Sequence, residues 1–406
     1  MGGKARWTEK RQNIRIDAIL MGTRKAVKPD PGVWLPLLDS YTLTALPHDT
    51  VLEGTLRADL DGASEEILVA LEAWPAQAYL DHQDGVTHVV LVYQMRDEPR
   101  SVPWLHLALL AATLVTTLAA GALMSGRDPF RTQVLELGGV VLPYPSRIRW
   151  QVLLEGVPFA LPFLGVLLAH EMGHYMAARA HRVRASLPYL IPFPPYFSII
   201  GTVGAFIRLR GPTVRRSALF DVGAAGPFAS FLISIPLLAL GLSMSQPVPG
   251  DVSLGTPFLI RFAGQPVWLG NGLVTHVLAS IFAPAPVGAA PLLLHPLALV
   301  GWLGLFVTAL NLLPLGQLDG GHVLYAMHPG RSVRAARWFM AALIPLGFAW
   351  WGWWAWAGLI AVLHRGRVAH PPVIQHAPAI GRTRSLLGML LILIFFLTFV
   401  PIPLRV

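Results

Sequence analysis

The sequence predicts a polytopic, all-α membrane bundle of about six to eight transmembrane helices, with a small α+β module at the N terminus. Of the 406 residues, 54% are hydrophobic and only 13% are charged, and the mean hydropathy is +0.55. These values lie outside the usual range of soluble globular domains. Apolar segments long enough to cross a bilayer recur from residue 102 to the C-terminal end.

The remaining composition narrows the class of protein further. The chain contains no Cys, which excludes a disulfide scaffold, a thiol nucleophile and Cys-ligated metal sites. The net charge is +9, but the basic residues stand in short groups between apolar segments. We therefore expect the lipid bilayer as a partner, and no nucleic acid.

Residues 1–100 have the pattern of a small cytoplasmic domain. Residues 49–60 alternate like a strand, residues 62–74 have helical spacing with Ser64 as the cap, and residues 77–82 and 86–95 have the composition of two further strands. This order predicts a β-α-β-β module. A loosely folded cytosolic tail is the alternative.

Residues 101–406 are expected to form the transmembrane domain. The expected spans are residues 102–124, 150–180 and 219–242, a segment that ends near Leu313, residues 338–363 and residues 386–400. Residues 338–363 fit either one long tilted helix or a hairpin of two short helices, because Pro345 and the WWGWWAW run interrupt them. Residues 186–211 carry four Pro residues, Gly201 and Gly204, so we expect a re-entrant, β-like loop there.

The positions of the Arg residues predict the orientation. Six lie between the second and third spans and three follow the fourth, and the positive-inside rule places such loops in the cytoplasm. The two groups are Arg182, Arg184, Arg208, Arg210, Arg215 and Arg216, and Arg331, Arg334 and Arg337. The N-terminal module is then cytoplasmic as well. The same rule favours the hairpin, which would make Arg365, Arg367, Arg382 and Arg384 cytoplasmic.

The second span contains His170-Glu171-Met172-Gly173-His174, an HExxH motif. Residues four apart share one face of a helix, so both imidazoles can bind one metal ion while Glu171 lies beside it. An ionised Glu inside a bilayer is costly unless it has a partner, which favours a functional site. The alternative is a pair of buried His residues bonded to carbonyls, with Glu171 paired to an Arg.

A third protein ligand is needed, and elimination leaves two candidate residues for it. Glu171 is the last Glu in the chain, and Ala177 and Ala180 stand where the longer motif requires Gly and His. Asp251 is expected on the opposite side of the membrane. Asp221 and Asp319 remain, and spacing alone does not separate them.

Two motifs, in this order, resemble the site-2 protease family of intramembrane zinc metalloproteases, peptidase family M50. They are HEMGH, and Asn311-Leu312-Leu313-Pro314-Leu315-Gly316-Gln317-Leu318-Asp319-Gly320, which is similar to the family's NxxPxxxxDG element. Residues 225–227 resemble its AGP element and residues 201–206 its glycine-bearing loop. The similarity covers a catalytic core of about residues 150–325, and the N-terminal module is similar to the ethylene-dependent gravitropism-deficient and yellow-green-like subgroup. Many relatives carry Asn where this chain has Ser230, which argues against a polar role there, and no PDZ-like insertion is found.

The resemblance implies one Zn²⁺ per chain, bound by His170, His174 and Asp319, with Glu171 as the general base. It also implies that Asn311 orients substrate or stabilises an oxyanion, although a helix-end cap is an equal alternative. Gly204 belongs to the segment from Tyr196 to Ile207, which could hold an extended substrate as an edge strand or simply fill the bundle.

The leading hypothesis is therefore a zinc metalloendopeptidase that cleaves transmembrane protein substrates, in regulated intramembrane proteolysis. A catalytically idle membrane chaperone or scaffold and a divalent-metal transporter are the alternatives. The intact Glu171 argues against the first. No repeat between halves supports the second. We expect a multi-pass protein of a prokaryotic plasma membrane.

Overall fold

The computed structural model describes residues 31–45, 49–60, 62–74, 78–83, 85–94, 103–137, 140–181, 183–210, 215–251, 256–363 and 380–405. The chain divides into two compact units, Met1–Glu98 and Pro99–Val406. Separate hydrophobic cores lie in the described parts of the two units.

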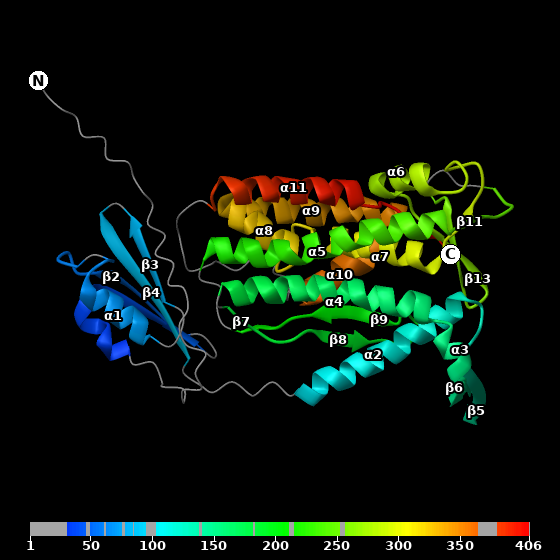
Figure 1. Cartoon of the computed structure of the whole chain (residues 1–406), viewed down its shortest axis with the longest axis horizontal. Coiled ribbons are helices and arrows are strands. Elements are labelled where there is room, and N and C mark those ends of the chain that lie inside the picture. Colours follow the sequence, from blue (N-terminus) through cyan, green and yellow to red (C-terminus); the bar gives the residue numbers. More distant parts are fainter. Residues whose placement is uncertain are drawn as a thin grey trace, which may run out of the picture. The chain divides into compact units, whose positions relative to one another are not determined.

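The N-terminal unit is a four-stranded antiparallel sheet with one helix against it (Figure 1). Its strands are in the order β1-β2-β4-β3, and Ile67 of the helix packs on Leu52 and Leu91 of the sheet. The elements are β1 (Leu38–Ala45), β2 (Asp49–Leu56), α1 (Glu65–Ala73), β3 (Ala78–Gln83) and β4 (Val86–Gln94). The predicted β-α-β-β order is confirmed for the last four elements. β1 was not predicted, because this edge strand contributes few buried side chains and residues 39–44 are exposed.

The second unit is largely helical. Its helices are α2 (Pro103–Met124), α3 (Trp150–Leu154), α4 (Val157–Ala180), α5 (Arg216–Ser243), α6 (Leu273–Phe282), α7 (Pro296–Asn311), α8 (Asp319–Met327), α9 (Pro329–Ala349), α10 (Gly352–Leu363) and α11 (Arg382–Thr398). Among the described residues, α2 and α5 are long and apolar enough to cross a membrane, and α6, α7 and α10 are shorter apolar helices. The apolar helices indicate membrane association, but six to eight transmembrane helices are not confirmed.

Helices α4, α5 and α7 form the centre of this unit and run side by side (Figure 1). The α4–α5 crossing is close because Gly173 has no side chain: a Cβ there would lie 2.7 Å from the Ala225 carbonyl oxygen. Small residues at such crossings let two helix backbones approach each other. The nitrogen of Gly226 lies at the same crossing, 3.1 Å from where a Cβ of Gly173 would be.

The segment 338–363 forms two helices. The break falls at Trp350 and Trp351, whereas Pro345 lies inside α9. The indole N–H of Trp354 donates to the carbonyl of Ile344 at 3.0 Å, so the second helix folds back on the first. The hairpin is confirmed as a pair of helices, while the number of membrane crossings stays a prediction. Arg365 and Arg367 lie outside the described residues, as does Arg182.

The expected β-like loop after α4 contains paired strands. β8 (Tyr189–Pro192) pairs with β9 (Thr202–Phe206), and β7 (Arg184–Ala185) pairs with β10 (Leu209–Arg210). Figure 1 shows β8 and β9 running alongside α4. The strand expected from Tyr196 to Ile207 is too long, because residues 195–201 form turns after two consecutive Pro residues.

The unit also contains strands that contradict a purely all-α bundle. β5 (Phe130–Leu137) and β6 (Val140–Ile148) form a hairpin. A five-stranded sheet has the order β11-β14-β12-β13-β15, and Figure 1 shows β11 and β13 at the end of the bundle opposite α8. Its strands are β11 (Gln246–Pro247), β12 (Phe258–Phe262), β13 (Gln265–Leu269), β14 (Leu292–Leu293) and β15 (Leu404–Arg405). These strands have only two to five residues each, so the alternation of polar and apolar residues along them is too short to detect in the sequence.

Candidate metal centre

The three predicted metal ligands meet at one point. His170 and His174 lie one turn apart on α4, both are buried, and their Nε2 atoms are 3.1 Å apart. Oδ2 of Asp319 lies 3.3 Å from each of these nitrogens. One ligand atom from each residue thus falls within 4.8 Å of the others, a grouping able to hold a metal ion.

Asp319 reaches this point because it is the first residue of α8, which starts close to the turn that follows α7. A Cβ at Gly320 would overlap the Leu312 carbonyl, and one at Gly321 would overlap the Gly316 carbonyl. The two glycines, both within α8, therefore allow a close approach between this helix and the turn before it.

The second ring nitrogen of His174 is fixed by the backbone of α5. Its Nδ1 lies 2.6 Å from the carbonyl oxygen of Val222. A carbonyl only accepts hydrogen bonds, so Nδ1 carries the proton and donates it. In the neutral ring, Nε2 then presents its lone pair towards Asp319, as a metal ligand must. Gly226 makes room for this ring, since a Cβ there would overlap it.

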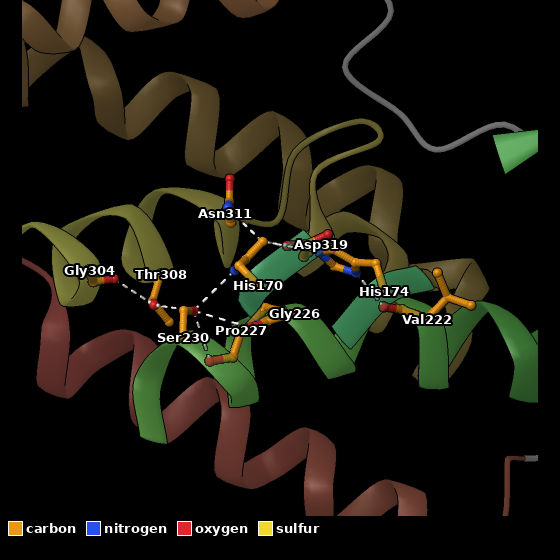
Figure 2. A network of polar contacts seen from close by, with 10 residues as sticks. All are labelled: His170, His174, Val222, Gly226, Pro227, Ser230, Gly304, Thr308, Asn311 and Asp319. Atoms are coloured by element: carbon orange, nitrogen blue, oxygen red, sulfur yellow. Dashed lines mark hydrogen bonds and ion pairs between the residues drawn. The ribbon is translucent and has the colours of Figure 1, made fainter. Parts of the chain in front are cut away.

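A chain of hydroxyl groups fixes His170 in the same way (Figure 2). Nδ1 of His170 lies 3.0 Å from Oγ of Ser230, which lies 2.8 Å from Oγ1 of Thr308. The Thr308 hydroxyl donates to the Gly304 carbonyl at 2.7 Å. With each group donating to the next, Nδ1 of His170 carries the proton and Nε2 has the lone pair that can bind metal.

The polar role of Ser230 contradicts the sequence expectation. The absence of Asn at this position argued against any polar function, yet the Ser230 hydroxyl is buried and contacts a ligand imidazole. A shorter side chain suffices because α4 and α5 cross closely at Gly173. Val222 and Thr308 were also missed, and no sequence motif marks a backbone carbonyl.

Glu171 lies next to the ligands in the sequence and is itself buried. Its side chain and that of Asp319 place two carboxylates in one largely buried site. Like charges in a water-poor site repel each other unless a cation compensates them. The electrostatics therefore favour a bound divalent metal ion.

Two cavities meet at this centre. One of about 220 Å³ has a mixed lining, with Gln317, Asp319 and His322 among its polar residues. The other, of about 360 Å³, is mainly apolar and extends away between α4, β9 and α7. Both are lined by His170, Glu171, Ala205 and Asn311, so the centre is accessible from two sides.

The two residues expected to bind substrate lie at these cavities. Nδ2 of Asn311, the last residue of α7, is 3.1 Å from Nε2 of His170. Gly204 lies in β9 with φ of 130°, a conformation that favours glycine, and lines the apolar cavity.

The other candidate carboxylates are elsewhere. Asp221 accepts hydrogen bonds from Nε and Nη2 of Arg384 at 2.8 and 2.7 Å, and its Oδ2 lies 2.7 Å from Nε2 of His181. It is the sixth residue of α5, beyond the first turn of the helix. Asp251 is exposed and outside the metal group.

The comparisons with known proteins agree with this geometry. Residues 158–349 match the model of peptidase family M50. The chain is 31% identical over 255 residues to the probable zinc metalloprotease EGY1, chloroplastic, of Arabidopsis thaliana. This alignment covers 61% of this chain and 43% of the relative. It is 30% identical over 323 residues to the probable zinc metallopeptidase EGY3, chloroplastic, of the same plant, covering 74% of this chain and 50% of the relative.

A further relative is the probable zinc metalloprotease EGY1, chloroplastic, of Oryza sativa subsp. japonica, which is 36% identical over 178 residues, or 43% of this chain and 29% of the relative. The chain spans at most about half the length of these relatives. No solved structure is significantly similar to the chain. The chloroplastic names give no support to the expected prokaryotic plasma membrane.

Proposed function

Because residues 158–349 match the model of peptidase family M50, we propose that this chain is a zinc-dependent endopeptidase that hydrolyses peptide bonds of membrane-embedded protein segments. One observation carries the proposal. Ligand atoms of His170, His174 and Asp319 converge within 4.8 Å, with buried Glu171 beside them.

The donor set fits zinc. Two imidazole nitrogens and one carboxylate oxygen are typical zinc ligands, and three protein ligands leave a position open for catalysis. Both imidazoles are held through their other nitrogen, by Ser230 and by the Val222 carbonyl. Such partners orient the rings of metal-binding histidines. The site therefore has the shape and the tautomers that zinc requires.

Glu171 performs the proton transfers. Zinc, when bound, supplies a Lewis acid that acidifies a water molecule and polarises the scissile carbonyl. The Glu171 carboxylate accepts a proton from the attacking water and then delivers it to the leaving amine. The amide of Asn311, beside His170, is positioned to donate a hydrogen bond to the developing oxyanion.

The substrate is held in an extended form along β9. A helical segment hides its carbonyls in its own hydrogen bonds, so it must be unwound before hydrolysis. Within the described residues, β9 pairs with β8 alone, which leaves its other edge without a strand partner. Ala205 of this strand lines both cavities at the metal centre. An added strand there would bring a peptide bond beside Glu171.

The membrane setting follows from the apolar helices and the placement of Arg residues. The metal centre lies towards the α8 end of the bundle, where α9 carries exposed Arg331, Arg334 and Arg337. The positive-inside rule assigns this end to the cytoplasmic side, or to the equivalent side of an organelle membrane.

The decisive experiment compares the wild-type protein with Glu171→Gln. A tagged single-span membrane protein is reconstituted with each enzyme in liposomes containing zinc, and its fragments are identified by mass spectrometry. We expect cleavage by the wild type and a loss of several orders of magnitude in the variant, with bound zinc unchanged. Phenanthroline should stop wild-type cleavage, and added zinc should restore it. Equal cleavage by both proteins would refute the proposal.

A further inference from the structure

The apolar cavity beside the metal centre has a wall that comes from outside the family's matched region. Trp356 lies on α10, whereas the family model ends at residue 349. The rest of the wall is formed largely by aliphatic and aromatic side chains, among them Phe163, Leu167, Leu303, Phe306 and Leu310. With about 360 Å³, the cavity has the size of a small-ligand site and can hold a large side chain.

The indole ring of Trp356, which lines this wall, also carries a polar N–H group. Its indole nitrogen is buried, and the described residues provide no hydrogen-bond partner for it. By contrast, Nε1 of Trp353 and Trp354 on the same helix donate to the carbonyls of Pro401 and Ile344. A buried donor without an acceptor is costly, and an incoming acceptor removes that cost.

From this geometry we infer that the apolar cavity is a specificity pocket for one large aliphatic or aromatic residue adjacent to the scissile bond, and that Trp356 donates a hydrogen bond to a carbonyl of the same substrate segment. The inference rests on the proposed peptidase function. Trp356 is a positioning residue here, because it contacts the substrate away from the reacting atoms.

The occupant is a segment of the substrate because the cavity is continuous with the site. His170, Glu171 and Asn311 line it, so a side chain within it belongs to a residue whose peptide bond lies near the metal ligands. Transmembrane segments are rich in Leu, Ile, Phe and Val, which match an apolar wall. The smaller cavity on the other side of the same residues, which Gln317, Asp319 and His322 help to line, provides the route for water.

The test uses a mixture of apolar, transmembrane-like peptides in which Ala, Ser, Leu and Phe occur at every position. The zinc-loaded full-length protein cleaves it in detergent micelles, and mass spectrometry identifies the cleavage sites. We expect cuts next to Leu or Phe at least about tenfold more often than next to Ala or Ser, as apolar pockets discriminate between side chains of different size. Glu171→Gln tested in parallel shows whether the cuts come from this enzyme.

Substitutions of cavity-lining residues test the pocket. Val307→Phe, or Leu303→Phe if the first fails to fold, fills the cavity and should shift cleavage towards small residues, with zinc content unchanged. Trp356→Phe keeps the ring and removes the N–H, so kcat/KM should fall by about threefold to tenfold, the effect of one hydrogen bond. Trp354→Phe is the matched control and should keep the wild-type kcat/KM.

The outcomes separate the two proposals. Wild-type cleavage no greater than that of Glu171→Gln refutes the peptidase function. If cleavage depends on Glu171 but shows no preference for large residues, the specificity pocket is refuted and the peptidase function stands. The same holds if the preference is unchanged when the cavity is filled. Wild-type kinetics in Trp356→Phe overturn the role of its N–H.

Discussion

Nδ1 of His170 lies 3.0 Å from the hydroxyl oxygen of Ser230, so a residue of α5 holds a metal-ligating side chain of α4. Ser230 is in turn bonded to Thr308 of α7, so three central helices meet at one imidazole. The orientation of His170 therefore depends on how these helices pack as well as on the HExxH motif itself.

The first prediction concerns this hydroxyl. Ser230→Ala should weaken zinc binding by about tenfold to 100-fold, because loss of a partner that orients a ligand has an effect of that size. The measurement is zinc competition with a chromophoric chelator. Ser234→Ala is the matched control: Ser234 lies one turn further along α5, is fully buried, and its hydroxyl has no hydrogen-bond partner among the described residues. Equal effects of both substitutions would show that only packing matters.

The metal ligands could be predicted from the sequence because their pattern is local. HExxH specifies two ligands and a base within one helical turn, whatever the rest of the fold does. The partners of these ligands could not be predicted in this way. Ser230 and Thr308 reach His170 across helix interfaces, and the partner of His174 is a backbone carbonyl.

The second prediction concerns the ion pair between Asp221 and Arg384. Arg384 makes two hydrogen bonds to this carboxylate and so fixes the start of α11 to α5. Arg384→Ala should destabilise the fold by about 1–2 kcal/mol, the lower part of the range for charge-assisted hydrogen bonds, since both side chains are partly exposed. Thermal unfolding in detergent measures the effect.

Arg382→Ala is the control for this substitution, because Arg382 is exposed in the same turn of α11. It should leave the unfolding temperature unchanged, and zinc content should be unchanged in both variants. A similar loss of stability in the two variants would mean that the positive charge at the helix start, and not the pair with Asp221, is responsible.

The boundaries of the apolar helices were predicted better than the boundaries of the strands. α2 was expected at 102–124 and is Pro103–Met124, since a long uncharged run permits little else. α5 starts three residues before its expected start because Arg216 is part of the helix, where its Nε donates to the Ala326 carbonyl at 3.0 Å. Hydropathy does not report such a contact, and it does not report strands of two residues.

The third prediction tests membrane topology. The chain has no native Cys, so single Cys residues can be introduced without removing others. Ser217→Cys, at the start of α5, should react with a membrane-impermeant maleimide from the side of the α8 end of the bundle, the cytoplasmic side in a bacterial host. Gln265→Cys, at an exposed position of β13 at the other end, should react from the opposite side. Reversed labelling would contradict the orientation inferred from the Arg residues.

The last prediction is that Asp319, and not Asp221, completes the zinc site. Oδ2 of Asp319 lies 3.3 Å from both imidazole nitrogens, while Asp221 is engaged by Arg384 and His181. Asp319→Ala should therefore lower zinc affinity by at least about 100-fold and abolish cleavage, because one of three protein ligands is lost. Asp221→Ala should keep its zinc, although the loss of its contacts should lower the unfolding temperature. Metal content after dialysis against a weak chelator distinguishes the two variants, and Asp319→Asn, which retains size and loses charge, shows whether the carboxylate itself is required. Zinc retained in Asp319→Ala and lost in Asp221→Ala would reassign the third ligand.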